Sequence, residues 1–176
     1  MKCSFEAYEG KEKYIFVSYA HKDSKIIMPI IEALHDNGYR IWYDDGIHAG
    51  DEWPEVIADR LVNSSLVLAF FSKNSLKSRN CKNEINYTIS ENIDMICIHL
   101  EELQMSRGMI MQLSSFQGIF YFAFASTSDF LKKLEKSDKL NSGLMEVKEE
   151  VVVEVKADDV EVSVDEKTDD VEVAVD

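Results

Sequence analysis

The sequence predicts an α/β fold in which a doubly wound, five-stranded parallel sheet carries helices on both faces. Two observations predict it. Over about residues 14–137, five short runs of apolar and β-branched residues alternate with stretches that have the apolar spacing of helices. Hydrophobic residues make up 45% of the chain and aromatic residues 10%, which is enough for a buried core and excludes a wholly disordered chain.

The first strand is expected at residues 14–19, and the helix after it has Asp23 or Ser24 as its cap. Five apolar residues recur at helical spacing in that helix: Ile26, Ile27, Ile30, Ile31 and Leu34. Because Pro29 lies inside the pattern, the helix either starts late, near Pro29, or bends there. Asn37-Gly38 closes the helix, since glycine commonly follows a helix end.

The remaining elements follow in the same alternating order. The second strand is expected at 39–43, the third and clearest one at 65–71, the fourth at 93–100 and the fifth at 119–124. Helices are expected at 54–61, at about 80–92 and from the caps in 126–129 through Lys136, with a doubtful one in 101–118. Right-handed crossovers between such strands give a flavodoxin-like sheet with the strand order 2-1-3-4-5.

The net charge of −14, from 33 acidic and 19 basic residues, is concentrated near the C-terminal end. Residues 146–176 hold 13 acidic and 3 basic residues, which leaves 20 acidic and 16 basic residues in 1–145. We expect 1–11 to be an N-terminal extension, 12–137 the folded domain and 138–176 a disordered, acidic, valine-rich low-complexity tail. An acidic chain is a poor general binder of nucleic acid or of an anionic membrane, because such contacts rely on lysine and arginine.

Targeting and cysteine patterns indicate a cytoplasmic protein. The first residues lack the apolar run of a signal peptide, and no stretch approaches the ~18 apolar residues of a membrane-spanning helix. Cys3, Cys81 and Cys97 are odd in number and widely spaced, so we expect no disulfide framework. No CxxC or HExxH pattern is present, so no bound metal is expected.

Ligands of doubly wound sheets bind beyond the carboxyl ends of the strands, which here are residues 18–23, 43–51 and 72–84. The first of these loops has no glycine, so it is neither a Walker loop nor a GxGxxG turn. An acidic receiver domain shares the fold class but needs an aspartate at the end of its third strand, where this chain has Phe70-Phe71-Ser72. These features argue against a nucleoside triphosphatase, a dehydrogenase and a receiver domain.

Three segments, in order and at suitable spacing, resemble the Toll/interleukin-1 receptor (TIR) domain family. Residues 14–20, YIFVSYA, resemble its first box, and residues 38–44, GYRIWYD, with the loop from Gly46 to Gly50, resemble its second strand and the loop after it. Residues 72–75, SKNS, with Cys81 and Glu84, resemble the third strand and the helix that carries the family's glutamate. The resemblance covers about residues 12–137 and is closest to microbial TIR proteins. It implies an enzyme that hydrolyses or cyclises NAD⁺ and releases nicotinamide, with NAD⁺ as its substrate and no cofactor.

The resemblance assigns catalysis to Glu84, in a helix pattern close to W-C-x-x-E in which Asn80 replaces the tryptophan. A carboxylate suits this chemistry, because nicotinamide leaves as a neutral group and a nearby negative charge stabilises the cationic ribose that develops. The structural alternative is an acid near a helix N-terminus, which the dipole favours by ~0.3–1 kcal/mol regardless of function. Cys81 is expected among the substrate-binding residues, either as a low-pKa thiol or as a small packing residue.

Further substrate contacts are expected at the same strand ends. Ser18 and Tyr19 either bind the substrate or simply close the first strand. Trp42 and Tyr43 are candidates for stacking on nicotinamide or adenine, although one of the two is expected in the core. Two cations are candidates for binding the pyrophosphate in the absence of a glycine cradle: Lys22 and Arg79.

In TIR domains the loop after the second strand mediates self-association, a role that the resemblance assigns here to Asp45, Gly46, Ile47, His48 and Gly50. Activity is then expected to need self-association, in a setting of microbial defence or signalling. The alternative is a non-catalytic module that binds other TIR domains, or an effector that interferes with host TIR signalling, and Asn80 favours it. A flavodoxin-like or nucleotide-binding domain with a bound cofactor is a third interpretation.

Overall fold

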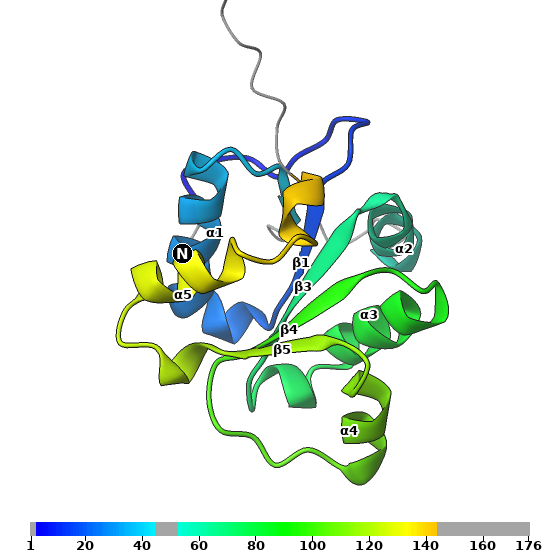
Figure 1. The fold of residues 1–176 in the computed structure, drawn as a ribbon. Helices are drawn as coiled ribbons and strands as arrows, with labels where there is room; N and C mark the ends of the chain where they lie inside the picture. The colour runs from blue at the N-terminus through cyan, green and yellow to red at the C-terminus, as the bar shows by residue number, and fades with distance from the viewer. Residues whose placement is uncertain (1–2, 45–52, 144–176) are drawn as a thin grey trace, which may run out of the picture. The chain divides into compact units, whose positions relative to one another are not determined.

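In the computed structural model, which describes residues 3–44 and 53–143, five parallel strands form one sheet in the order β2-β1-β3-β4-β5 (Figure 1). The strands are β1 (Ile15–Ser18), β2 (Ile41–Tyr43), β3 (Leu66–Phe71), β4 (Met95–His99) and β5 (Gln117–Phe120). Each pairs with its neighbours in parallel, and β1 and β3 form the centre of the sheet. The predicted fold class and strand order are confirmed.

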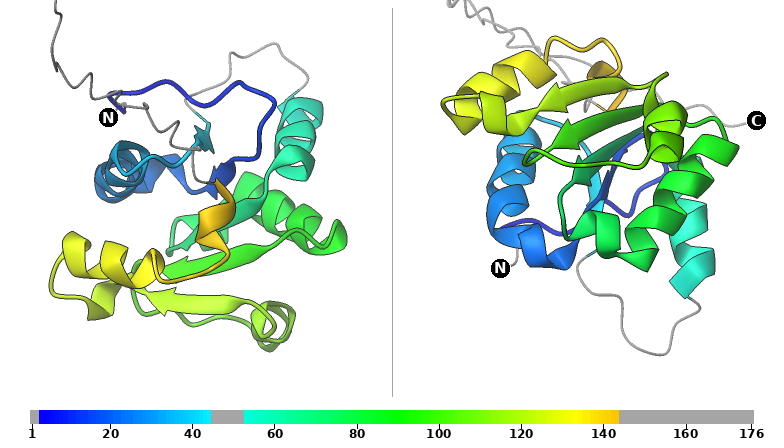
Figure 2. Two further views of the ribbon diagram at one scale, coloured as in Figure 1. Left: turned by 45° about the horizontal axis from the view of Figure 1, so that its top comes forward. Right: turned by 90° about the horizontal axis from the view of Figure 1, so that it is seen from below.

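Helices cover both faces of this sheet (Figure 2). On one face lie α1 (Ser24–Asp36) and α5 (Thr127–Leu134), and on the other lie α2 (Trp53–Asn63), α3 (Arg79–Ser90) and α4 (Arg107–Leu113). The two faces have separate hydrophobic cores, because successive residues of a strand point to opposite sides. In β1, Ile15 and Val17 belong to the core under α1, whereas Phe16 belongs to the core under α2 and α3. Burial on both faces explains why the strands read as continuous apolar runs.

The helix after β1 starts early and runs through its proline. It begins at Ser24 and ends at Asp36, with Pro29 in its second turn, so the late start considered from the sequence is wrong. Pro29 has no N–H for the carbonyl four residues earlier, and the helix loses that one hydrogen bond. Packing of its apolar stripe offsets the loss, since Ile27, Ile30 and Leu34 are fully buried. Gly38 then reverses the chain at a φ of +90°, a conformation that side chains with a Cβ rarely adopt.

The fifth strand is shorter and lies earlier than expected. It ends at Phe120, and Tyr121–Ala123 form a short 3₁₀ turn instead of continuing the strand. The apolar residues here misled the prediction because β5 is an edge strand, and Phe120 and Phe122 are about half exposed. Before β5, the doubtful helix of the mixed region exists as the seven-residue α4.

Packing continues on both sides of the range 12–137. Before it, Phe5 packs against the core under α1, and the Tyr8 N–H donates to the Ile41 carbonyl at 2.8 Å. After it, Leu140 is fully buried in the same core, at the start of the short 3₁₀ helix Leu140–Gly143. The extension and the first residues of the expected tail are therefore part of the folded unit. The remaining tail, 144–176, lies outside the described residues. Among the helices that are described, none combines the length and apolar character needed to cross a membrane.

Candidate active site

A pocket of about 330 Å³ opens at the carboxyl ends of the two central strands, where doubly wound sheets bind their ligands. We call it the strand-end pocket. One side comes from β1, the loop after it and the end of β2: Phe16, Val17, Tyr19, Ala20, His21, Lys22 and Asp44. The other side comes from the segment between β3 and α3 and from the first turns of α3: Asn74, Lys77, Ser78, Asn80, Cys81 and Glu84.

Glu84 lies in the second turn of α3, which starts at Arg79 with Ser78 as its cap. The Ser78 hydroxyl accepts a hydrogen bond from the Cys81 N–H at 3.3 Å and so fixes the start of the helix. The helix dipole acts most strongly in the first turn, and Glu84 lies just beyond that turn. The dipole alone is therefore a weak reason for an acid at this position.

The Glu84 carboxylate is held by β1. The Ser18 hydroxyl donates a hydrogen bond to Glu84 Oε2 at 2.6 Å, which joins the central strand to α3. Burial raises the pKa of Glu84 to about 7, although the Ser18 hydrogen bond opposes this shift; the nearby Asp44 raises the pKa further, and His21 lowers it. Near neutral pH the group thus exists as both carboxylate and carboxylic acid. A carboxyl group tuned to this range in a cleft is a candidate for acid–base or electrostatic catalysis.

Side chains beyond β1 and β2 form the outer rim of the pocket. The Tyr19 hydroxyl donates to the Asp44 carbonyl at 2.9 Å, and His21 Nε2 lies 3.1 Å from Asp44 Oδ2. These contacts tie the loop after β1 to the residue at which β2 gives way to the next loop. They orient Asp44 toward the pocket that holds Glu84.

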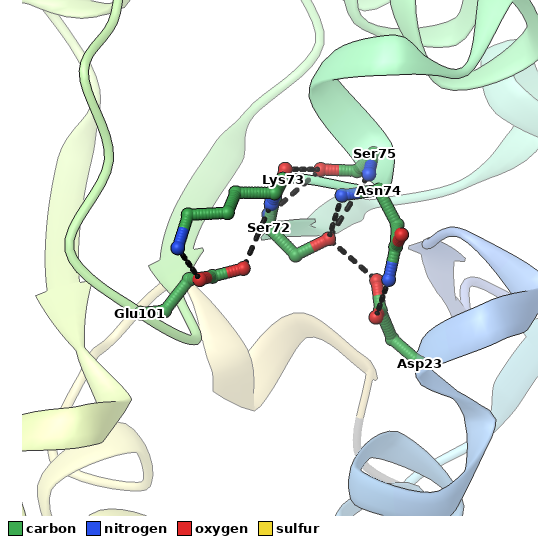
Figure 3. Close-up of polar contacts among 6 residues, drawn as sticks. All are labelled: Asp23, Ser72, Lys73, Asn74, Ser75 and Glu101. Atoms are coloured by element: carbon green, nitrogen blue, oxygen red, sulfur yellow. Dashed lines mark hydrogen bonds and ion pairs between the residues drawn. The ribbon is translucent and has the colours of Figure 1, made fainter.

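A buried carboxylate fixes the opposite rim (Figure 3). Asp23 accepts hydrogen bonds from the Ser72 hydroxyl at 2.5 Å and from Asn74 Nδ2 at 2.6 Å. The Ser72 hydroxyl oxygen in turn accepts from the N–H groups of Asn74 and Ser75, each at 3.0 Å. Because a carboxylate only accepts, Asp23 dictates that Asn74 presents its amide nitrogen inward. The orientation of Asn74 at the pocket wall is thereby set by a residue 51 positions earlier.

A second, exposed contact closes the same turn. Glu101 accepts from the Lys73 N–H at 2.9 Å and pairs with its ammonium group at 2.9 Å, as Figure 3 shows. These contacts lower the pKa of Glu101, since the hydrogen bonds from Lys73 favour its ionised form. The turn between β3 and α3, which carries Asn74 and Lys77 into the pocket, is thus tied to both neighbouring loops.

The structure brings most of the predicted residues together. Tyr19, Lys22, Cys81 and Glu84 line the pocket, and Ser18 contacts Glu84 from the strand beneath it. Burial raises the pKa of the Cys81 thiol to about 11, so Cys81 is not the low-pKa thiol considered from the sequence.

Trp42 and Tyr43 do not line the pocket, contrary to the stacking role expected for them. Trp42 is 3% exposed and stacks on Phe16 with ring centroids 4.8 Å apart. Tyr43 is 2% exposed on the other face of the sheet, where its hydroxyl donates to the Phe5 carbonyl at 2.7 Å. Adjacent residues of β2 point to opposite faces, and helices cover both, so each aromatic side chain is part of a core.

Among the described residues, the lysines that line the pocket are Lys22 and Lys77, and the predicted Arg79 is exposed outside it. Lys77, Asn74 and the rim residue Asp44 also line the pocket and were not predicted as site residues, although the loops that hold them were predicted to form the site. Their positions follow from the 3₁₀ turn Ser75–Lys77 and from the end of β2, which set the direction of single side chains. The loop residues Asp45, Gly46, Ile47, His48 and Gly50 lie outside the described residues.

The chain is thus a small, doubly wound α/β domain. Its candidate site, with the carboxyl group of Glu84, lies at the carboxyl ends of the central strands, where the direction of winding reverses. Residues 15–136 match the family model described as the TIR domain, and the chain belongs to this family. No curated protein sequence gives a significant match.

Solved structures with similar folds fall into two groups. The TIR domain of the Toll-related receptor TRR-2 from Hydra magnipapillata is 17% identical, with a TM-score of 0.58 over 69% of this chain and 94% of that one. The TIR domains of the activated Roq1 resistosome are 13% identical, with a TM-score of 0.59 over 71% and 98%. The CMP N-glycosidase BcmB from Clostridium botulinum is 17% identical, with a TM-score of 0.53 over 70% and 98%. At these identities the likeness concerns the fold.

Proposed function

We propose that this chain cleaves NAD⁺ at the bond between nicotinamide and ribose, by hydrolysis or by cyclisation. The observation that carries the proposal is the Glu84 carboxyl group, held by the Ser18 hydroxyl in a pocket that also presents Lys22 and Lys77. A carboxylate at one end and ammonium groups elsewhere complement a dinucleotide that has a cationic glycosidic bond and an anionic pyrophosphate.

In the proposed reaction the bond between ribose C1′ and the ring nitrogen breaks, and its electron pair stays on that nitrogen. Nicotinamide therefore leaves as a neutral molecule and needs no proton. The positive charge moves to C1′ and the ribose ring oxygen, where the ionised form of Glu84 stabilises it. Water then attacks C1′ and gives its proton to Glu84 or to solvent, so the products are ADP-ribose, nicotinamide and one proton. In cyclisation, a nucleophilic atom of the adenine ring takes the place of water.

The fold of known proteins is compatible with this proposal. BcmB, which shares the fold, is described as a CMP N-glycosidase, a name that denotes cleavage of an N-glycosidic bond. The Roq1 TIR domains belong to an activated resistosome, which is an assembly. We propose that this chain likewise self-associates, through the loop 45–50, and acts in the cytoplasm in microbial defence or signalling.

Purified protein incubated with NAD⁺ at high protein concentration tests the proposal, with nicotinamide and ADP-ribose measured by chromatography and mass spectrometry. Nicotinamide release that falls by on the order of 100-fold in Glu84→Gln supports it, because that change removes the negative charge and keeps the shape. Absence of nicotinamide release, even when beads or crowding drive assembly, overturns the proposed enzymatic activity. Full activity in Glu84→Gln overturns the assignment of Glu84 alone.

One observation favours a second candidate function. Asn80 is exposed at the pocket wall, at the position where the family pattern carries tryptophan, so the aromatic contact of that pattern is missing. A non-catalytic module that binds other TIR domains, or interferes with host TIR signalling, needs no such contact. It predicts complex formation between TIR domains without nicotinamide release in the same assay.

A further inference from the structure

The amide side chain of Asn74 has a fixed orientation at the wall of the strand-end pocket. Its nitrogen, Nδ2, donates a hydrogen bond to Asp23 Oδ1 at 2.6 Å, and Figure 3 shows this nitrogen turned toward Asp23. The other oxygen of the same carboxylate accepts from the Ser72 hydroxyl. Because a carboxylate accepts and does not donate, turning the Asn74 amide over would bring two acceptor oxygens together. The amide oxygen, Oδ1, therefore points away from Asp23.

The groups that hold this amide are themselves buried. Asp23 is 8% exposed, Ser72 1% and Ser75 5%. The Ser72 N–H donates to the Ser75 hydroxyl at 2.8 Å, and the Ser72 hydroxyl oxygen accepts from two backbone N–H groups of the same turn. A buried network in which every member has its partners is rigid, so the orientation of the Asn74 amide does not adapt to a ligand.

The oxygen of the Asn74 amide is available to a ligand. Among the described residues, none donates a hydrogen bond to Asn74 Oδ1. No buried side-chain nitrogen or oxygen in the described part of the chain lacks a partner, so Oδ1 is in contact with solvent. Since Asn74 lines the strand-end pocket, it offers that pocket a neutral acceptor whose direction is set before any ligand binds.

This acceptor differs in charge from the lysines and the carboxyl group of the pocket. Lys22 and Lys77 only donate hydrogen bonds and attract anionic groups, and Glu84 is the group that the proposed reaction uses to stabilise a cation. A neutral carbonyl oxygen is unsuited to phosphate oxygens, which also accept. It matches an uncharged donor, such as a hydroxyl group.

The size of the pocket indicates which part of the substrate supplies that donor. A volume of about 330 Å³ is too small for a whole dinucleotide. The residues that line the pocket together with Glu84 are therefore expected around the ribose whose C1′ reacts. The donors of that ribose are its 2′- and 3′-hydroxyl groups.

We propose that Asn74 is a specificity-determining residue whose amide oxygen accepts a hydrogen bond from a hydroxyl group of the nicotinamide ribose, and that Asp23 positions it. This inference rests on the proposed function and assigns a substrate contact within the same site. The site then selects ribonucleotides, because an analogue without that hydroxyl leaves a fixed acceptor without its donor.

Binding of ADP-ribose to the full chain tests this contact without turnover. The probes are ADP-ribose and its two analogues that lack either the 2″- or the 3″-hydroxyl of the terminal ribose, which is the ribose that nicotinamide leaves. Calorimetric titration is expected to give a Kd about tenfold higher for one of the analogues, which is the effect of one hydrogen bond. Asn74→Ala is expected to bind ADP-ribose and that analogue equally, and so to lose the preference.

Two further variants separate this contact from a structural role of Asn74. Asp23→Asn combined with Asn74→Asp exchanges donor and acceptor and still turns an oxygen toward the pocket, so it should retain the preference. Asn86→Ala, the same change at an exposed residue of α3 outside the pocket lining, is the matched control and should keep the wild-type affinities. A general disturbance of the pocket would weaken all three probes by a similar factor and leave the preference in place.

An unchanged preference in Asn74→Ala overturns the inference, as does a wild type that shows no preference or does not bind ADP-ribose. Where Asn74→Ala fails to fold, loss of the preference in the folded double variant overturns it. Nicotinamide release by a wild type without the preference would leave the proposed function standing and remove the ribose contact. A preference that depends on Asn74, without any NAD⁺ cleavage, would keep the contact and remove the proposed reaction.

Discussion

The carboxyl ends of β1 and β3 differ from those of β4 and β5, although all four belong to one sheet. At β1 and β3 the chain places hydroxyls, carboxylates and amides, and the buried Ser18, Asp23 and Ser72 all have hydrogen-bond partners. At β4 and β5 it places rings: His99 of β4 stacks on Phe120 of β5 with ring centroids 4.9 Å apart, and its other side reaches Phe71, the last residue of β3, at 5.5 Å. The same fold position thus serves polar chemistry in the middle of the sheet and aromatic packing at its edge.

The largest effect is expected from breaking the polar side of this comparison at Asp23. Asp23→Ala leaves the Ser72 hydroxyl and the Asn74 amide without their buried acceptor, which costs about 2–4 kcal/mol of unfolding free energy. Chemical denaturation of the full chain measures it. The double variant Asp23→Asn with Asn74→Asp reverses donor and acceptor and is expected to recover most of the loss. If the double variant is no more stable than Asp23→Ala, the hydrogen bond between Asp23 and Asn74 does not contribute to the free energy of unfolding.

The pH dependence of cleavage tests the tuning of Glu84. Burial raises its pKa to about 7, and the proposed reaction uses the ionised form, so kcat is expected to rise about tenfold between pH 6 and pH 8. Initial rates of nicotinamide release at saturating NAD⁺ measure this. A profile that is flat across this range would show that ionised Glu84 does not limit the rate.

The same shift affects stability with the opposite sign. The unfolded chain releases the Glu84 proton near the ordinary pKa of 4.5, and the folded chain keeps it until about 7. The folded state is therefore destabilised as pH rises from 4.5 to 7, by about 3 kcal/mol at most. Glu84→Gln lacks this loss, so its stability relative to the wild type should increase over that window. Parallel denaturation curves at pH 4.5 and pH 8 give the comparison.

Substitutions of Lys77 and Arg79 compare a cation that lines the pocket with one that lies outside it. Lys77→Gln is expected to raise KM for NAD⁺ about five- to tenfold, since a charge-assisted contact to phosphate contributes ~1–1.5 kcal/mol. Arg79→Gln, two residues away and outside the pocket lining, is the control and should leave KM unchanged. Equal effects of the two changes would place the phosphates elsewhere.

The smallest effect belongs to the aromatic edge. Burial lowers the pKa of His99, so the folded state resists its protonation and loses stability as pH falls through the ordinary value of 6.5. His99→Phe keeps the stacked ring and removes this loss. Thermal unfolding at pH 5 and pH 7.5 should show a reduced acid sensitivity, while nicotinamide release stays at the wild-type rate. A change in release would tie the edge to the chemistry.

The sheet was predictable because strands buried on both faces leave a strong trace in the sequence, as in 65–71. The edge strand leaves a weaker one, so its predicted range wrongly includes the half-exposed Phe122. In the site, Glu84 and Ser18 followed from the resemblance of short motifs. The stacking role predicted for Trp42 is wrong. Its position in a strand does not tell which face of the sheet its ring joins, and helices pack on the face that it does join. Lys77 depends on the path of one 3₁₀ turn, which no periodicity encodes.

The hydrogen bond from Ser18 to Glu84 links residues 66 positions apart in the chain. Such a contact closes a long loop and forms only when β1, β3 and α3 have already come together. The carboxyl group thus acquires its surroundings late in folding, as a product of the assembled sheet. A nascent or partly unfolded chain contains the same glutamate, exposed to water, with an ordinary acidity and no pocket. The proposed cleavage of NAD⁺ would therefore begin only once folding is complete.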